Sequence, residues 1–161
     1  MTFKLNLLSI LSLSIMLLVL FSACKESKSK ADFTKNAGMV LPVLPPEIKA
    51  KLLKECRFVD YIMHNLPISV SQSEQEAIMA NVMFIDDSAP SEVPSNCKPI
   101  ARKFYQYLDG SSLEADLYFS TDCIFYVFLE GGKPKYAANI TDKGKNFYAQ
   151  IIKVGTQGQA Q

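Results

Sequence analysis

The chain has 161 residues, with 17 Lys and Arg against 16 Asp and Glu and a single histidine, and its net charge is +1 at pH 7. Lys4 is the only charged residue among the first 23, so the rest of the chain carries 16 basic and 16 acidic residues. Binding to a polyanion requires a clustered excess of Lys and Arg. We therefore expect no nucleic-acid partner.

Residues 1–23 begin with this one basic residue, continue as an apolar stretch with serines, and end in small residues. Such an order is typical of a secretory signal peptide. Ser22, Ala23 and Cys24 resemble the lipobox of bacterial lipoproteins. The resemblance implies that the chain is cut before Cys24 and that this cysteine carries the acyl chains. It also implies a location in the bacterial cell envelope, where the lipid anchors the protein to a membrane. We expect the outer membrane, on its periplasmic or its exposed side.

Two alternatives remain open for this first segment. The apolar run has about the ~20 residues that a bilayer-spanning helix needs, and an ordinary cleaved signal also fits. Small residues directly before a lone cysteine, and a polar stretch after it, favour the lipoprotein. Residues 24–45 then contain the lipidated cysteine and a flexible tether. A single folded domain is expected over residues 46–154, followed by a polar tail at 155–161.

The first part of this domain is predicted to be helical. Residues 46–67 predict one helix, because apolar residues recur there at three- and four-residue spacing. A second helix is predicted over about residues 72–85, where Ser71 and Glu74 have the spacing of a capping box. Residues 86–99 read as a long surface loop. The apolar stripe of the first helix consists of Ile48, Leu52, Cys56, Val59 and Met63.

Beyond the loop, the hydrophobic period changes to two. Residues 100–108 and 113–119 predict a β-hairpin, and residues 123–130 and 133–140 extend it. Residues 141–154 predict a C-terminal helix. Two N-terminal helices, a three- or four-stranded antiparallel meander and one C-terminal helix correspond to an α+β fold.

The predicted strand at residues 123–130 is apolar on both faces. We expect Phe125, Val127 and Leu129 to face the helices, so that an aromatic set points the other way. Such a face suits binding of an envelope protein or a glycan, because tyrosine buries a large area at low entropic cost. Alternatively, residues 39–46 or the third helix cover this face. The aromatic set consists of Tyr105, Tyr107, Tyr118, Tyr126 and Phe128.

With Cys24 lipidated, three cysteines remain, an odd number for an oxidising compartment. Cys97 precedes the first predicted strand and Cys123 begins the third. Both are therefore expected near the same end of the sheet, which predicts a disulfide between them and leaves Cys56 as a buried thiol. Pairing of Cys56 with Cys97 remains an alternative.

Cys56, Met63 and His64 offer an alternative function, a copper or zinc site, because soft sulfur ligands suit Cu(I) and cysteine with histidine suits zinc. No CxxC or HxxxH spacing supports such a site. The motifs of serine hydrolases, P-loop enzymes, zinc proteases and nucleotide-binding enzymes are also absent from the sequence. We therefore expect a non-enzymatic binding or accessory module, with no catalytic residue, no metal and no cofactor.

Overall fold

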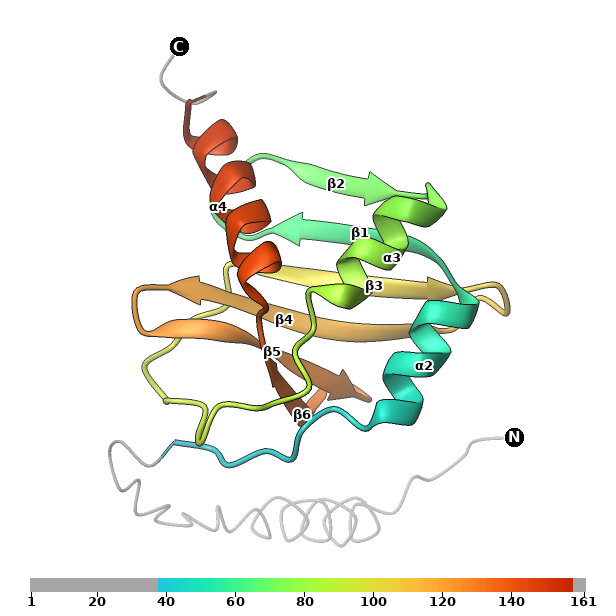
Figure 1. Ribbon diagram of the computed structural model, residues 1–161. Coiled ribbons are helices and arrows are strands. Elements are labelled where there is room, and N and C mark those ends of the chain that lie inside the picture. The colour runs from blue at the N-terminus through green and yellow to red at the C-terminus, as the bar shows by residue number, and fades with distance from the viewer. Residues whose placement is uncertain (1–37, 158–161) are drawn as a thin grey trace, which may run out of the picture. The chain divides into compact units, whose positions relative to one another are not determined.

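The computed structural model describes residues 38–157, and these form an α+β domain (Figure 1). Within this range, six antiparallel strands make one sheet in the order β2-β1-β3-β4-β5-β6. Three helices lie on one side of the sheet, in front of it in Figure 1. The predicted fold class is confirmed, although the sheet has two more strands at its N-terminal edge than predicted. The elements are α2 (Pro46–Glu55), β1 (Cys56–Met63), β2 (Ser69–Gln72), α3 (Gln75–Met83), β3 (Ala101–Tyr107), β4 (Ser112–Ser120), β5 (Cys123–Glu130), β6 (Lys133–Asn139) and α4 (Asp142–Gln157).

Strand β1 occupies a part of the chain for which the sequence predicted a helix. α2 ends at Glu55, and the backbone becomes extended at Cys56 (φ −67°, ψ 137°). From there Val59, Tyr61 and Met63 are buried with a period of two. β-branched and aromatic residues, which are frequent in this stretch, fit a pleated sheet well, and β1 pairs with both β2 and β3. The prediction of one long helix is therefore wrong beyond α2.

The edge strand β2 and the start of α3 also differ from the prediction. The sequence SVSQ has little apolar alternation, and its conformation depends on pairing with β1, in which Ser71 lies opposite Asp60. The Ser71 hydroxyl donates a hydrogen bond to the Asp60 carboxylate. α3 begins only at Gln75, and the residue before it, Glu74, makes no side-chain cap. The predicted capping box does not form.

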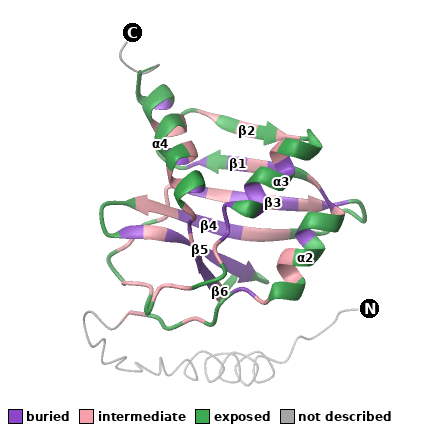
Figure 2. Ribbon diagram, viewed as in Figure 1, coloured by how far each residue is buried: buried purple, intermediate pink, exposed green. Residues whose placement is uncertain are grey.

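The helix-covered face of the sheet carries the main core, shown by the buried strand residues in Figure 2. α4 packs closely on this core, because Gly144 has no side chain to keep it apart. A Cβ at Gly144 would lie 2.8 Å from Cβ of Phe84. The ring of Phe147 consequently reaches the ring of Phe84, with 5.1 Å between the centroids. The largest fully buried side chains of this core include Tyr61, Tyr105, Tyr126, Phe128 and Tyr148.

The opposite face of the sheet, which we call the outer face, is covered over β5. There a second apolar cluster packs beneath residues 38–45 and the loop at residues 86–99. The cluster consists of Cys123, Phe125, Val127 and Leu129, with Leu41, Val93, Cys97 and Tyr118 packed against it.

Residues 38–45, expected to be the end of a flexible tether, pack along β6 and the loop. The Leu44 N–H donates to the Ala137 carbonyl at 3.2 Å, and the Ala137 N–H donates to the Pro42 carbonyl at 2.9 Å. Met39 and Val93 exchange backbone hydrogen bonds of 2.9 and 2.7 Å. The bonds at Ala137 cover the outer edge of β6, and the Met39–Val93 pair joins the segment to the loop.

A disulfide joins Cys97 of the loop to Cys123 at the start of β5, with 5.9 Å between the Cα atoms. The predicted pairing is confirmed, and Cys56 is the free, buried cysteine of the described residues. The disulfide fixes the loop on the outer face over β5.

The C-terminal helix is longer than predicted. α4 continues to Gln157, so the first three residues of the predicted polar tail are helical. Gly155 is buried, and a Cβ there would lie 2.8 Å from Leu66. No helix among residues 38–157 is long and apolar enough to cross a membrane. The predicted signal peptide, Cys24 and the first part of the tether lie outside the described residues.

Candidate functional site

The five aromatic residues predicted to form one binding face do not lie together on the surface. Tyr105, Tyr126 and Phe128 are fully buried beneath the helices, and Tyr107 is 9% exposed in the same core. Tyr118 lies on the outer face, stacked on a phenylalanine of β5 with 4.7 Å between the ring centroids. The faces of β5 are therefore the reverse of those expected.

The reversal has a physical reason. Alternation with a period of two determines which residues share a face, but not which face the helices cover. Both faces of β5 are apolar, so this strand alone leaves the choice open. The aromatic face meets Tyr148 of α4, whose ring centroid lies 6.2 Å from those of Tyr61 and Tyr126. The other face packs under the extended residues 38–45.

The outer face is exposed over β1, β3 and β4, on the side of the sheet away from β5 and β6. Phe58 and Ile62 of β1 are 46% and 52% exposed, and Phe104 of β3 is half-buried. Their neighbours Val59 and Tyr61 point to the core instead. We call this surface the open face. It is formed by Phe58, Asp60, Ile62, Arg102, Phe104, Gln106, Glu114 and Asp116.

One row of the open face places an aromatic ring between two carboxylates. Phe104 lies opposite Asp60 of β1 on one side and opposite Glu114 of β4 on the other. Such cross-strand neighbours have Cβ atoms about 4.5–5.5 Å apart. The Asp60 carboxylate accepts hydrogen bonds from the Ser71 hydroxyl and the Gln106 amide, which fix its orientation.

The next row contains the only basic side chain of the open face. Arg102 lies between Ile62 of β1 and Asp116 of β4. Its Nε and Nη2 donate to the two oxygens of Asp116 at 2.8 and 3.1 Å, and its Nη1 lies 3.5 Å from Glu114 Oε2. The hydrogen bond to Asp116 raises the pKa of Arg102, so the guanidinium stays charged and paired.

A shallow depression of about 570 Å3 lies where the open face meets β2. Its walls combine apolar side chains with oriented polar groups, a composition typical of recognition surfaces. The lining residues that also belong to the open face are Asp60, Ile62, Phe104 and Gln106, and the remaining residues come from β1 and β2.

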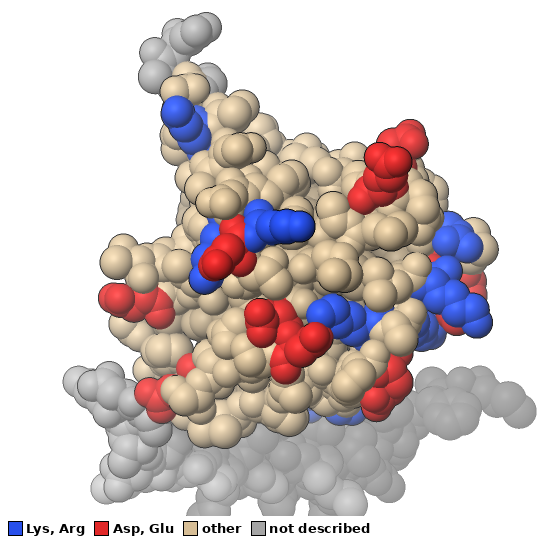
Figure 3. Space-filling view, viewed as in Figure 1, with Lys and Arg blue, Asp and Glu red and all other residues tan. Residues whose placement is uncertain are grey.

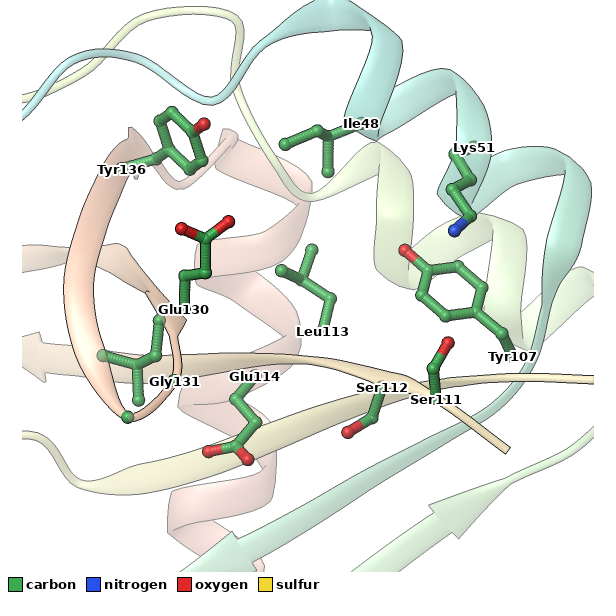
Figure 4. Close-up of a pocket in the computed structure, with 12 residues that line it drawn as sticks. Ile48, Lys51, Tyr107, Ser111, Ser112, Leu113, Glu114, Glu130, Gly131 and Tyr136 are labelled. Atoms are coloured by element: carbon green, nitrogen blue, oxygen red, sulfur yellow. The ribbon is translucent and has the colours of Figure 1, made fainter. Parts of the chain in front are cut away.

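A second cleft, of about 500 Å3, lies between α2 and the turns at one end of the sheet (Figure 4). Lys51 of α2 lies over the ring of Tyr107, with Nζ 4.4 Å from its centroid. Burial raises the pKa of Tyr107 to about 12, so its hydroxyl is protonated at neutral pH. Glu130 on the rim already pairs with Lys135. The charges of both signs in this cleft favour no single class of ligand.

The most unusual polar group of the core is Lys103, which is fully buried. Its Nζ donates hydrogen bonds to Asn81 Oδ1 at 3.2 Å and to the Tyr148 hydroxyl at 2.9 Å. Four tyrosine rings surround this nitrogen, with attractive cation–π geometry for the charged form. The distances from Nζ to the ring centroids are 4.7 Å for Tyr61, 4.7 Å for Tyr105, 5.1 Å for Tyr126 and 5.5 Å for Tyr148.

Burial lowers the pKa of Lys103 well below its ordinary value of 10.5, and the same burial raises the pKa of Tyr105 and Tyr148. A neutral amine is a nucleophile, but Lys103 lines none of the clefts described above. In this conformation it has no route to a substrate. We therefore treat Lys103 as a polar group of the core and not as a candidate catalytic residue.

The residues of the alternative metal site do not come together. Cys56 and Met63 begin and end β1, and seven steps of about 3.3 Å separate them by roughly 23 Å. His64 follows Met63, and its Nδ1 lies 3.1 Å from the Pro99 carbonyl. The described residues contain no cluster of three His, Cys, Asp or Glu side chains that could hold a metal. This fold therefore rules out a site built from Cys56, Met63 and His64.

The sequence prediction missed the open face because it assigned residues 56–63 to a helix. A signal was nevertheless present. In the sequence CRFVDYIM, Val59, Tyr61 and Met63 alternate with Asp60 and Ile62, which is the pattern of a strand with one apolar and one mixed face. No protein-family model, no curated protein and no solved structure matches this chain.

Proposed function

We propose that this protein is a lipoprotein of the bacterial cell envelope, anchored to a membrane through Cys24, whose domain binds another envelope protein through the open face. It is an accessory or binding module and not an enzyme. Two observations support the location. Ser22, Ala23 and Cys24 resemble a lipobox, and the Cys97–Cys123 disulfide is of the kind that forms in oxidising compartments such as the periplasm.

The observation that carries the binding role is the exposure of Phe58 and Ile62. The outer face of the sheet is covered over β5, but over β1 these two side chains remain open to solvent. Both side chains are about half exposed on the same strand. Exposed apolar side chains gathered on one face with a polar rim mark interaction surfaces. Aromatic residues and arginine are also enriched at protein interfaces, and Phe104 and Arg102 lie on the open face beside them.

The size of the open face indicates the kind of complex. Its three strands, spaced about 4.8 Å apart and each with about seven residues rising 3.3 Å, cover roughly 330 Å2 of flat sheet. A stable interface of standard size takes about 800 Å2 from each partner. The open face alone therefore suits a transient complex, or a partner that also contacts the edge of β2.

The anchor is tested by the intact mass of the protein extracted from the membranes of its host. We expect loss of residues 1–23 and added acyl mass on Cys24. The Cys24→Ala variant should lack this mass and should leave the membrane fraction on washing. A chain that retains residues 1–23 would contradict the proposed anchor.

The binding role is tested with a pair of substitutions on the open face, Phe58→Ser with Ile62→Ser. A matched control is Met79→Ser with Met83→Ser, because these residues of α3 are 47% and 56% exposed on the helix side. We expect the open-face variant to lose the partner that the unchanged protein retains on purification, and the control to keep it. Equal retention by both variants, with unchanged thermal unfolding, would contradict the proposed role.

A further inference from the structure

We infer that the partner presents a basic side chain between two apolar ones, and that the basic group lies over Phe104 of the open face. This inference rests on the proposed function, because it names the chemistry of the partner for the same surface. It is carried by the charge of the open face and by the order of its side chains.

The open face has an excess of negative charge. Asp60, Glu114 and Asp116 provide three carboxylates, and Arg102 provides the one basic group, so the net charge is −2. The helix-covered side has no comparable excess, because acidic and basic side chains are interspersed over it in Figure 3. The field of a charged surface attracts partners of opposite sign and suppresses partners of like sign.

This charge discriminates between the possible occupants. A second copy of the chain would bring two negative faces together, which costs free energy. An anionic lipid surface would be repelled for the same reason. A protein segment with a basic side chain gains attraction on approach, and its apolar neighbours remove Phe58 and Ile62 from water.

The position of the basic group follows from the strand register. Phe104 lies between Asp60 and Glu114, and a cation over a phenylalanine ring gains electrostatic attraction from the ring face. The Asp60 carboxylate is already oriented by Ser71 and Gln106. A carboxylate accepts about four hydrogen bonds, so Asp60 keeps acceptor capacity for a guanidinium or an ammonium.

The apolar groups have a matching spacing. Phe58 and Ile62 lie two residues before and two residues after Asp60 on β1, at about 6.6 Å each along the strand. An extended partner segment with apolar, basic and apolar residues at alternate positions presents all three to one side with the same spacing. The probe that fits this pattern is acetyl-Leu-Ser-Arg-Ser-Leu-amide.

The test uses the full chain in nanodiscs of phosphatidylcholine, labelled with 13C at the isoleucine methyl groups. Ile62 reports on the open face, and Ile152 of α4 reports on the helix side. At about 10 mM salt, where charges interact over about 30 Å, the arginine peptide should shift the Ile62 methyl signal in a saturable way. The same peptide with citrulline, which has the shape of arginine without its charge, should bind about tenfold more weakly.

Two variants locate the effect. Asp60→Asn preserves the shape of the side chain and should weaken binding of the arginine peptide about two- to fivefold. Asp142→Asn removes the same charge from the exposed start of α4 and should leave binding unchanged. Equal affinity of the arginine and citrulline peptides, or equal effects of the two variants, would overturn the inference.

A further arm tests a rival occupant, the basic stretch of this chain at residues 25–35. Replacing Lys28, Lys30 and Lys35 by glutamine should leave the Ile62 signal of the peptide-free protein unchanged. A shift of that signal, with tighter peptide binding, would assign the open face to this stretch and overturn the inference.

The inference can fail while the proposed function holds. This is the case if the variant with Phe58→Ser and Ile62→Ser loses the partner but the arginine and citrulline peptides bind equally well. That result would refute the basic side chain of the partner and leave the binding role of the open face intact.

Discussion

The pair formed by Lys103 and Asn81 makes a quantitative prediction about the core. Asn81→Leu leaves the buried amine with the Tyr148 hydroxyl as its remaining hydrogen-bond partner. Leaving a buried donor unsatisfied costs about 1–3 kcal/mol. We therefore expect this variant to lose about 2 kcal/mol in the free energy of unfolding.

Lys103→Met has two opposing effects on the free energy of unfolding. It removes two hydrogen bonds, worth about 1 kcal/mol each, but it also removes the cost of burying an amine that has no carboxylate partner. Replacing buried ionisable groups by apolar ones of similar volume is often neutral or stabilising. Asn81 keeps the bonds that its Nδ2 donates to Gln72 and the Ala77 carbonyl, but its buried Oδ1 loses the Lys103 donor. This loss costs about 1–3 kcal/mol, and the removed cost of burying the amine offsets it. We expect a change within about 1 kcal/mol.

The double variant, Asn81→Leu with Lys103→Met, removes both partners and leaves no unsatisfied amine. Its stability should be close to that of the unchanged protein, which gives a coupling free energy of about 2 kcal/mol between Lys103 and Asn81. Equilibrium unfolding in urea measures all four proteins. Additive effects within about 0.5 kcal/mol, or a loss above about 3 kcal/mol for Lys103→Met alone, would refute this account of the core.

The pKa of Lys103 also predicts how stability depends on pH. Burial lowers this pKa in the folded state, so the unfolded chain binds more protons in the interval below about 10.4. Stability should therefore rise with pH through this interval, and Lys103→Met should abolish the rise. At higher pH the trend should reverse, because burial raises the pKa of Tyr105 and Tyr148 and the unfolded chain then loses protons first.

Three further outcomes are expected. Replacing Cys97 and Cys123 by serine should lower the free energy of unfolding by about 3–4 kcal/mol, from the chain-entropy model for their separation of 26 residues, as measured in urea. Gly144→Ala should lower the melting temperature despite the higher helix propensity of alanine, because its Cβ would lie 2.8 Å from Phe84. Cys56 should resist iodoacetamide in the folded protein and react in urea, because it is buried and burial raises its pKa; intact mass measures the product.

The part of the fold that the sequence predicted well is the part with short-range signals. Residues 100–140 alternate with a period of two and are divided by Gly110, Gly131 and Gly132, whose positive φ angles suit tight turns. The four strands there were predicted close to their observed bounds. Cys97 and Cys123 could be paired because Cys97 precedes the first of these strands and Cys123 begins the third, which puts both near the same end of the sheet.

The prediction failed for residues 56–63, whose conformation depends on tertiary pairing. Val59 and Met63 are four residues apart, which fits a helix as well as a strand, and only the neighbours β2 and β3 decide between them. The prediction of the candidate binding face was wrong for the same reason, because it also depends on contacts between distant parts of the chain. The sequence of β5 shows two apolar faces, and which of them the helices cover depends on α4 and on residues 38–45, far away in the chain.

The measurement that tests the central proposal most directly is photo-crosslinking from Ile62 in living cells of the host. A photoreactive amino acid at Ile62 should give one discrete protein adduct that depends on Cys24. The same group at Val154, which is 69% exposed on α4, should give none. Absence of an adduct from Ile62, or the same adduct from both positions, would contradict binding through the open face.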